Sequence, residues 1–294
     1  MHPSTWPSWT GIGLLYLLCL LPWRPRMALG KGIGHLAYYL ARGRRHIAEV
    51  NLKQCFPSKS DRERQALVRQ NMVALGMGLM ETATAWLRSP ESFAHRFSIE
   101  GLHHLESAVN KGQGVLLLGF HFTTMDLAAA YLATLIPMGA MYRKNKNPVI
   151  DYMMFKGRAR NLNHVIERED IKGLIKTLRQ GGIVWYGPDQ DYGRKYSVFV
   201  PFFDVETATI KATARIARMS KAQVIVFRHY RQAGDKAYTI QLSGPLEDYP
   251  CDDPATDARR INSLVEEAVL MQPEQYWWIH RRFKTRPAGQ ERPY

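Results

Sequence analysis

Apolar and polar positions divide the chain into three stretches. Residues 9–21 form an almost continuous apolar run. Residues 27–50 and 61–88 then repeat apolar positions at helical spacing, with basic residues between them in the first stretch, which predicts two amphipathic helices. From residue 113 onward, short apolar runs alternate with longer helical patterns. This alternation predicts strands that alternate with helices.

The third stretch predicts an α/β fold whose sheet is mixed, largely parallel and flanked by helices. Runs such as 114–120 and 182–187 are apolar throughout, as expected of strands covered on both faces. Ligands of such folds gather at the carboxyl ends of the strands. The expected strands are 114–120, 138–143, 164–167, 182–187, 223–230 and 236–243, and the expected helices are 126–135, 148–160, 169–180, 207–219 and 256–271.

The first apolar run predicts an N-terminal membrane helix. No Lys, Arg, Asp or Glu precedes Arg24, and tryptophans flank the run at Trp6, Trp9 and Trp23. Counted from Trp6, the run just reaches the roughly 20 residues that span a bilayer. The basic residues that follow place the rest of the chain in the cytoplasm. A secretory signal peptide and a buried core helix are the alternatives, but the signal peptide lacks a basic start and a small-residue cleavage site.

These patterns define the domain organisation. Residues 1–23 are expected to be the membrane anchor, and residues 24–112 a helical, basic region close to the membrane. Residues 113–294 are expected to form the α/β catalytic domain, because no linker long enough to divide this part occurs. Within the middle region, the helix over 27–50 is expected to lie along anionic headgroups.

The charge of the chain supports this organisation. There are 40 Lys and Arg against 26 Asp and Glu, a net charge of +14 over 294 residues. Residues 24–69 hold eleven basic and three acidic side chains, whereas residues 70–280 hold 24 and 22. Basic ends favour a nucleic acid or a phospholipid surface as partner. The almost neutral centre lacks a basic stripe with interleaved aromatics, which disfavours nucleic acid.

Neither a metal nor a cofactor is expected. The three cysteines are Cys19, Cys55 and Cys251, too few and too scattered for a disulfide framework or a thiolate metal site. They indicate a reducing compartment for the body of the chain. Gly30-Lys-Gly-Ile-Gly34 follows no expected strand, so it does not predict a dinucleotide site.

Candidate chemistry begins with His121-Phe-Thr-Thr-Met-Asp126, which follows the first strand of the α/β region. The spacing allows the Asp126 carboxylate to fold back and orient the His121 ring, so that the other ring nitrogen takes a proton from a substrate hydroxyl. A core histidine with satisfied hydrogen bonds is the alternative. The place of the pair, where an α/β sheet usually carries its site, favours a general base.

Charged residues after other strands extend this site. Arg143 ends the second strand, Arg158 lies on the following helix, and Asp189 and Asp191 lie in the turn Gly187-Pro-Asp-Gln-Asp-Tyr-Gly193. Together they suit a phosphorylated or otherwise anionic substrate. For Arg158, a solvated helix face remains an alternative.

The sequence resembles the late acyltransferases of lipid A biosynthesis, inner-membrane enzymes that add secondary laurate or myristate to the lipopolysaccharide precursor. Family members commonly carry glutamate where this chain has Asp126. The matching segments cover most of the chain in order: Ala48–Pro57, the His121 and Asp126 pair, Tyr142–Pro148, Gly157-Arg158, Gly182–Gly193, Ser197–Phe203 and Gln275–Lys284.

The resemblance implies a glycerol-phosphate-acyltransferase-like fold behind one membrane helix, and it singles out His121, Asp126 and Arg158 for chemistry. It implies acyl carrier protein as donor, a lipid A precursor as acceptor and contact with inner-membrane phospholipids. Arg143, Asp189, Asp191 and Arg194 are then expected to bind substrate. Carrier docking is expected at Arg194 and Lys195 or at the cluster 281–286. An acyltransferase for another lipid, a nucleic-acid-binding protein and a lipid-binding protein without turnover remain alternatives.

Overall fold

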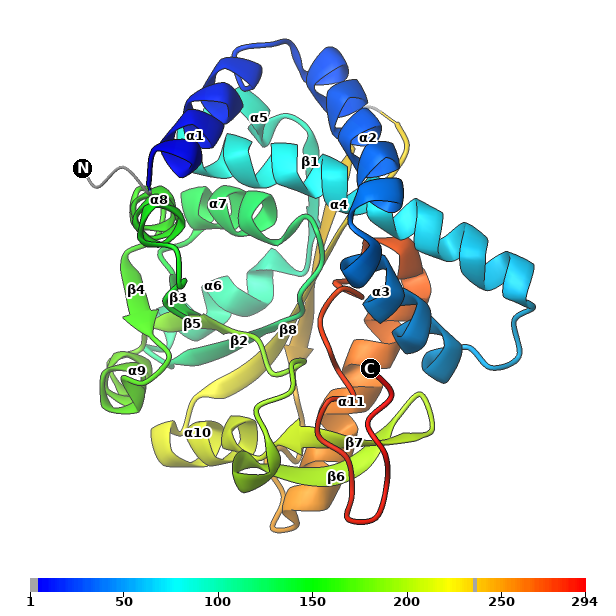
Figure 1. The fold of residues 1–294 in the computed structure, drawn as a ribbon. Coiled ribbons are helices and arrows are strands. Elements are labelled where there is room, and N and C mark those ends of the chain that lie inside the picture. Colours follow the sequence, from blue (N-terminus) through cyan, green and yellow to red (C-terminus); the bar gives the residue numbers. More distant parts are fainter. Residues whose placement is uncertain (1–4, 235–236) are drawn as a thin grey trace.

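The computed structural model describes residues 5–234 and 237–294 (Figure 1). Its centre is a seven-stranded sheet with the order β1-β9-β8-β2-β5-β3-β4, beside a separate antiparallel hairpin of β6 and β7. Neighbouring strands of the large sheet are parallel except for β8 and β9. The strands are β1 (Phe97–Glu100), β2 (Val115–Gly119), β3 (Gly139–Tyr142), β4 (His164–Glu167), β5 (Ile183–Tyr186), β6 (Ser197–Phe202), β7 (Val205–Ile210), β8 (Gln223–Arg231) and β9 (Tyr238–Pro245).

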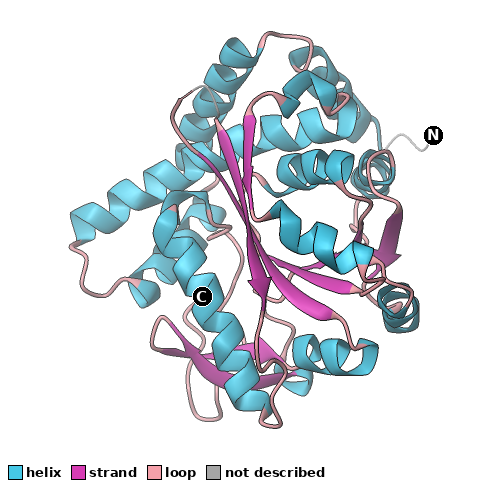
Figure 2. Cartoon of the chain, turned by 180° about the vertical axis from the view of Figure 1, so that it is seen from behind, coloured by secondary structure: helices cyan, strands magenta, loops and turns pink. Residues whose placement is uncertain are grey.

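Helices cover both faces of the sheet, as the view from behind shows (Figure 2). Two short 3-10 helices, Arg194–Tyr196 and Pro273–Gln275, complete the described elements. The predicted α/β fold with a largely parallel sheet is thereby confirmed. The α-helices are α1 (Trp6–Leu18), α2 (Trp23–Leu40), α3 (Arg42–Cys55), α4 (Asp61–Leu87), α5 (Glu91–Ala94), α6 (Leu102–Asn110), α7 (Met125–Leu135), α8 (Pro148–Ala159), α9 (Ile171–Arg179), α10 (Ala212–Ser220) and α11 (Pro254–Met271).

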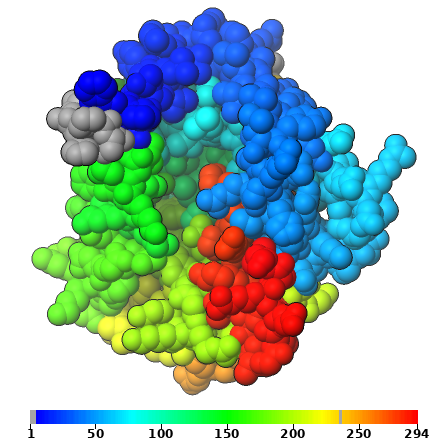
Figure 3. Space-filling model, viewed as in Figure 1, coloured from blue at the N-terminus to red at the C-terminus, as the bar shows by residue number. Residues whose placement is uncertain are grey.

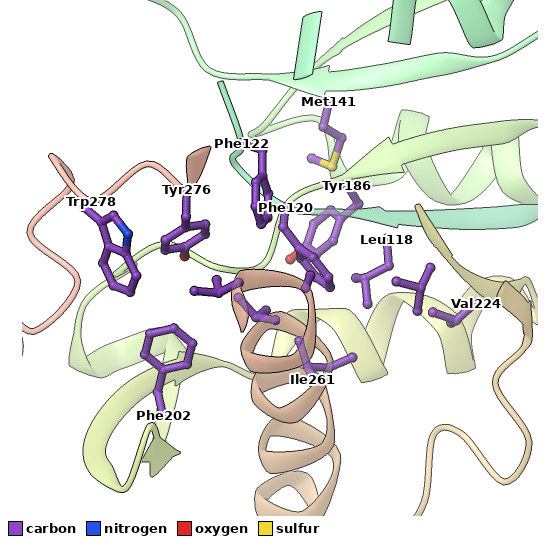
Figure 4. Packing of buried hydrophobic residues seen from close by; sticks show 14 of the residues in the cluster. Leu118, Phe120, Phe122, Met141, Tyr186, Phe202, Val224, Ile261, Tyr276 and Trp278 are labelled. Atoms are coloured by element: carbon purple, nitrogen blue, oxygen red, sulfur yellow. The ribbon is translucent and has the colours of Figure 1, made fainter. Parts of the chain in front are cut away.

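Strand β2 shows why a central strand of the sheet is apolar throughout. Leu116 and Leu118 belong to the buried cluster that includes residues of α9, α10 and α11. Val115 and Leu117 point the other way, into a second cluster with residues of α6 and α7. Figure 4 shows the first cluster, in which side chains of several strands meet α11 and the C-terminal segment. Because successive strand residues face opposite sides, a strand with two covered faces contains no polar position.

The N-terminal segment differs from the prediction. Helix α1 has 13 residues, and its side chains are intermediate or exposed. At 1.5 Å per residue it is about 20 Å long, well short of the roughly 30 Å hydrocarbon core of a bilayer. Within residues 5–234 and 237–294, no helix is both long and apolar enough to span a membrane. The predicted anchor over 1–23 is therefore unsupported, and its residues 1–4 lie outside the described part. A turn around Pro22 leads into α2, and the predicted helix over 27–50 is divided at Ala41 into α2 and α3.

Glycines allow α2 and α4 to cross in main-chain contact. A methyl group placed on Gly76 of α4 would overlap the carbonyl oxygen of Gly30 and the amide nitrogen of Gly34 on α2. A methyl group on Gly34 would in turn overlap the main chain of Met72 and Val73. Only residues without a side chain permit this approach, because any Cβ would push the helices apart.

Most predicted elements of the α/β region are confirmed within about two residues, with one clear error. The helix predicted over 207–219 begins only at Ala212, because Thr207 and Thr209 belong to strand β7. Both threonines are buried, and Thr209 hydrogen-bonds to Asn262 of α11, so packing against α11 holds this segment extended. The elements β1, α5, α6 and β6 were also missed.

Candidate active site

The order of the strands brings two polar turns together. The turn with His121 follows β2, and the turn Gly187–Gly193 follows β5. Strands β2 and β5 are parallel neighbours, with Leu118 opposite Tyr186. Their carboxyl ends therefore open at the same edge of the sheet, where parallel α/β folds usually hold their ligands.

At this edge, Asp189 holds His121 through both of its carboxylate oxygens. The Nδ1 atom of His121 lies 2.5 Å from Asp189 Oδ1, and the His121 main-chain N–H donates to Oδ2 at 2.8 Å. The Asp189 side chain is 1% exposed and that of His121 is 22% exposed. Burial opposes ionisation of Asp189, but the nearby His121 charge and these hydrogen bonds outweigh burial and lower its pKa. An ionised Asp189 places the ring proton on Nδ1 and leaves Nε2 free to accept another.

The structure thus gives His121 a different partner from the predicted Asp126. Asp126 lies in the first turn of α7 and binds Arg158 of α8 instead. Arg158 Nε donates to Asp126 Oδ1 at 2.7 Å, and Nη2 donates to Oδ2 at 3.3 Å. Both side chains are largely buried, at 14% and 11% exposed. Arg158 is therefore not on a solvated helix face, and its Nη1 makes no hydrogen bond with the described residues.

The Asp126 and Arg158 pair lines a narrow pocket between α4, α7 and α8. Most of the remaining wall is apolar, and Trp185 of β5 forms part of it. Trp185 also meets the His121 ring edge to face, with 5.7 Å between ring centroids. The same indole therefore contacts the histidine and lines the apolar pocket. The other lining residues are Ala85, Trp86, Met125, Ala129, Ala130, Ala140, Gly157, Asn161 and Leu162.

The space-filling view shows a hollow on this face of the molecule (Figure 3). Its rim is formed by the N-terminal helices in blue, the segment around α8 in green and the C-terminal segment in red. Parts of the chain from all three stretches of the sequence therefore surround the opening.

The C-terminal segment fixes the turn that carries His121. Phe122 and Tyr276 form an antiparallel bridge. The His121 carbonyl accepts from the Trp277 N–H, and the Thr123 N–H donates to the Gln275 carbonyl, both at 2.9 Å. These main-chain bonds leave the turn little freedom.

Two buried asparagines hold the same C-terminal segment from the helical side. Asn51 of α3 donates to the carbonyls of Trp278 and His280 at 2.6 and 2.7 Å. Asn71 of α4 donates to the carbonyls of Glu274 and Tyr276, both at 2.8 Å. The motif Ala48–Pro57 thus supports the site through Asn51, a positioning role that its sequence alone does not indicate.

A buried ion pair supports the turn from the other side. Arg231, at the end of β8, forms two hydrogen bonds of 2.7 Å with the fully buried carboxylate of Glu81 on α4. Tyr238 also donates to Glu81, and Arg231 reaches Thr123 at 3.3 Å. Sequence reasoning missed this cluster, because its members lie as many as 157 residues apart.

The other predicted substrate-binding residues have different surroundings. Asp191 is buried, and it accepts from the main chain of Gly193 and from the main chain and hydroxyl of Thr285. It therefore ties the turn to the C-terminal segment, and the prediction that it faces substrate is not supported. Asp189 likewise faces His121. Arg143 and Arg194 are exposed, and Arg194 donates to the Arg286 carbonyl.

The described residues contain no group of three or more His, Cys, Asp or Glu side chains arranged to hold a metal ion. What the arrangement offers is acid–base chemistry: a histidine backed by a buried carboxylate, beside an arginine and an apolar pocket.

Comparison with known proteins identifies the family and relatives of the chain. The family model described as bacterial lipid A biosynthesis acyltransferase matches residues 1–285. Two Escherichia coli (strain K12) proteins cover nearly the whole chain. The lipid A biosynthesis lauroyltransferase is 42% identical over 98% of this chain and 95% of its own length. The palmitoleoyltransferase is 37% identical over 100% of this chain and 96% of its own length.

The lipid A biosynthesis myristoyltransferase of the same organism is 33% identical over 100% of this chain and 91% of its own length. Among solved structures, the 1-acyl-sn-glycerophosphate acyltransferase of Thermotoga maritima matches with a TM-score of 0.39 and 15% identity. That match covers 85% of this chain and 98% of the other.

Proposed function

The chain belongs to the bacterial lipid A biosynthesis acyltransferase family, and we propose that it moves a fatty acyl group from acyl carrier protein to a hydroxyl group on an acyl chain of a lipid A precursor. The observation that carries this proposal is His121, held by the buried Asp189 at the carboxyl end of β2. The mostly apolar lining of the narrow pocket beside it matches the chemistry of a fatty chain, and no serine or cysteine nucleophile is needed.

In the proposed reaction His121 is the general base. Its Nε2 takes the proton of the acceptor hydroxyl, and the resulting oxygen nucleophile forms a bond to the thioester carbonyl carbon. The carbon–sulfur bond then breaks, and the imidazolium returns the proton to the thiolate that leaves on the carrier protein. The ester and the free carrier thiol are the products, and no covalent acyl-enzyme forms.

Asp189 keeps His121 ready for this step. Its carboxylate accepts the Nδ1 proton and thereby selects the ring form whose Nε2 lone pair is free. It also stabilises the positive charge that the ring gains when the hydroxyl proton is taken. This is the role of the buried aspartate in a serine hydrolase, with the acceptor alcohol in place of the serine.

Arg158 is proposed to stabilise the negative charge that develops on the thioester oxygen. Asp126 fixes the guanidinium through Nε and Nη2, which leaves Nη1 to meet the substrate. Preorganised donors of this kind contribute roughly 3 kcal/mol to catalysis in other acyl-transfer enzymes. In this proposal Asp126 serves chemistry through Arg158.

The acidic carrier protein is proposed to dock on basic side chains at the rim of the hollow. Arg194, Lys195 and Arg281 are exposed and supply positive charge without a carboxylate partner among the described residues. Arg143, also exposed, acts electrostatically on Tyr192, which lies in the same turn as Asp189. Substrate contact by Arg143 and Arg194 therefore remains part of the proposal.

The N-terminal helices are proposed to rest on the cytoplasmic leaflet of the inner membrane. On α1, Leu14 and Leu17 are 57% and 60% exposed, and on α2, Leu36 and Leu40 are 58% and 71% exposed. Exposed leucines beside the basic residues of α3 suit a helix that lies in the interface between headgroups and acyl chains. Membrane association then needs no spanning segment.

The test is acyl transfer by the purified full-length protein, with radiolabelled acyl carrier protein as donor and a lipid A precursor as acceptor. His121→Ala should retain less than about a hundredth of wild-type activity, because it removes the base. His103→Ala, an exposed histidine on α6, is the matched control and should remain fully active. More than a tenth of the activity in His121→Ala would rule out the base role.

The acceptor is tested separately by mass spectrometry of lipid A from cells with and without the protein. The proposal expects a mass difference equal to one acyl group. An unchanged mass, with transfer to a lysophospholipid or an aminolipid in the purified system, would reassign the acceptor and leave the chemistry of His121 intact.

A further inference from the structure

A second pocket, lined by three arginines, lies where α1 turns into α2. It is bounded by Trp23 and Arg26 of α2, Arg88 at the end of α4, and Arg96 just before β1. Its volume is about 260 Å³. One water molecule occupies roughly 30 Å³ in the liquid, so the pocket has room for a phosphate group with several waters.

The three arginines of this pocket have no carboxylate partner among the described residues. Arg88 and Arg96 make no side-chain hydrogen bond with the described part of the chain, and the Arg96 guanidinium lies over the Trp23 ring, 4.8 Å from its centroid. Three guanidinium groups without a counter-charge around one cavity leave it strongly positive. Electrostatics therefore favours an anion inside.

Arg26 is built into the pocket wall. It is 7% exposed, and it donates to the Thr84 hydroxyl at 2.9 Å and to the Cys19 carbonyl at 2.6 Å. Its Nε is buried and has no hydrogen-bond partner. A buried N–H without a partner costs free energy, and a ligand that accepts this N–H would recover it.

The charges of these arginines affect one another. Burial is the main cause that lowers the pKa of Arg26, and the positive charges of Arg88 and Arg96 lower it further. The guanidinium groups therefore lie close enough to repel. A bound anion would remove this repulsion, as it does in clusters of arginines that bind phosphate.

Exposed leucines line the pocket or lie on the adjoining helix, which indicates the source of the anion. Leu20 lines the pocket and is 53% exposed, and Leu17 on the adjoining α1 is 60% exposed. The pocket also lies at the edge of the sheet that carries His121. Phe97, which follows Arg96, pairs with Tyr238 of β9, and Tyr238 pairs with Arg231 at the end of β8. Because β8 is parallel to β2, this end of β8 lies at the same edge as His121. A soluble anion would not bury the exposed leucines next to its site, whereas a lipid headgroup brings acyl chains that can contact them.

We infer that the pocket formed by Arg26, Arg88 and Arg96 binds the phosphate group of a membrane lipid headgroup while Leu20 and the exposed Leu17 of α1 contact the acyl chains. The inference concerns binding alone, so it stands whether or not the proposed acyl transfer is correct.

The experiment measures binding of the full-length protein to phosphatidylcholine vesicles that contain phosphatidic acid. Arg88→Gln/Arg96→Gln should weaken binding at least about tenfold, because each arginine supplies charge-assisted hydrogen bonds to phosphate. Lys111→Gln/Lys221→Gln removes the same charge from exposed sites before β2 and β8, at the opposite edge of the sheet, and should weaken binding less than about twofold.

Two further measurements identify the ligand. Vesicles that carry equal negative charge as oleate, which has no phosphate, should bind both double variants almost equally. An excess of inorganic phosphate should not displace the protein from phosphatidic acid vesicles. Arg88→Lys/Arg96→Lys keeps the charge, and it should give an intermediate loss because lysine lacks the forked donor geometry.

Each opposite result overturns the inference. Equal losses for the Arg88/Arg96 and Lys111/Lys221 variants would show a general charge effect. An equal loss on oleate vesicles would show that phosphate is not recognised, and displacement by inorganic phosphate would assign the pocket to a free anion. Should the glutamine variant fail to fold, the lysine variant carries the same comparison.

Discussion

Replacement of Asp189 by asparagine directly tests the proposed role of Asp189 as the partner of His121. Both oxygens of Asp189 accept hydrogen bonds from His121, one from Nδ1 and one from the main-chain N–H. An asparagine has one oxygen and one NH2 group, so its NH2 group must take the place of one carboxylate oxygen and lie against an N–H donor of His121. Either the main-chain bond is lost, or the ring turns to the form with its proton on Nε2, which cannot act as a base.

The expected magnitude follows from the charge that is lost. A carboxylate and an imidazolium with their charges about 4 Å apart attract by roughly 4 kcal/mol at an effective dielectric constant of 20. Because about 1.4 kcal/mol changes a rate tenfold, Asp189→Asn should lower the rate constant of transfer about a thousandfold. The loss should fall on kcat more than on KM, since Asp189 acts on the step in which His121 takes the proton and not on substrate binding.

The assay is steady-state acyl transfer from radiolabelled acyl carrier protein, with thermal unfolding as the check on folding. Asp248→Asn is the matched control. Asp248 is exposed and has a φ of 50°, a conformation that asparagine tolerates well, so this variant should keep full activity. The reasoning is refuted if Asp189→Asn keeps more than a tenth of the activity, because the Asp189 carboxylate would then not be needed to orient His121 or to stabilise its positive charge.

Three further predictions concern stability and membrane contact. Glu81→Gln should lower the free energy of unfolding by about 3 kcal/mol in urea titrations, because it leaves Arg231 buried without a counter-charge; an unchanged midpoint would contradict this. Burial lowers the pKa of His229 to about 3, so the unfolded chain binds the extra proton first and stability falls as the pH drops below about 6.5. From pH 7 to pH 5 this costs about 2 kcal/mol, and His229→Gln should remove that part of the fall in urea titrations at the two pH values. Leu14→Ser/Leu17→Ser should weaken vesicle binding at least tenfold, because burial of each exposed leucine in the membrane contributes about 2 kcal/mol. Equal binding of the variant and the wild type in co-sedimentation would exclude α1 from the membrane contact.

The sequence predicts the strands well because the physics that buries them is local. A strand with both faces covered must be apolar at every position, and the run around Leu116 to Leu118 shows this without any knowledge of the fold. The segment Thr207–Ile210 fails the same reasoning. Its threonines are buried through hydrogen bonds to α11, a partner that local patterning cannot reveal.

The sequence predicts which residues gather at the site but not which of them contact one another. His121, Asp189 and Arg158 were all expected at one edge of the sheet, and the structure brings them there. Which carboxylate meets His121 depends on the position of β5 directly beside β2, a relation between residues 68 apart. Spacing along the chain favoured Asp126 instead, because it lies only five positions after His121.

The apolar N-terminus shows a limit of another kind. Hydrophobicity predicts contact with something apolar, but it does not decide between crossing a bilayer and lying on it. Helix α1 ends at Leu18, and Pro22, which lacks a main-chain N–H, stands where the chain turns into α2.

The crossing of Gly30 and Gly34 against Gly76 also sets a distance for the whole enzyme. Main-chain atoms that touch have no rotamers to adjust, so α2 cannot slide or tilt on α4 as helices separated by long side chains can. Because α4 also carries Glu81, whose partner Arg231 reaches Thr123 next to the histidine turn, this main-chain contact fixes the height of the His121 ring above α2. Gly76→Ala would therefore act as a spacer that moves the His121 ring away from any surface on which α2 rests.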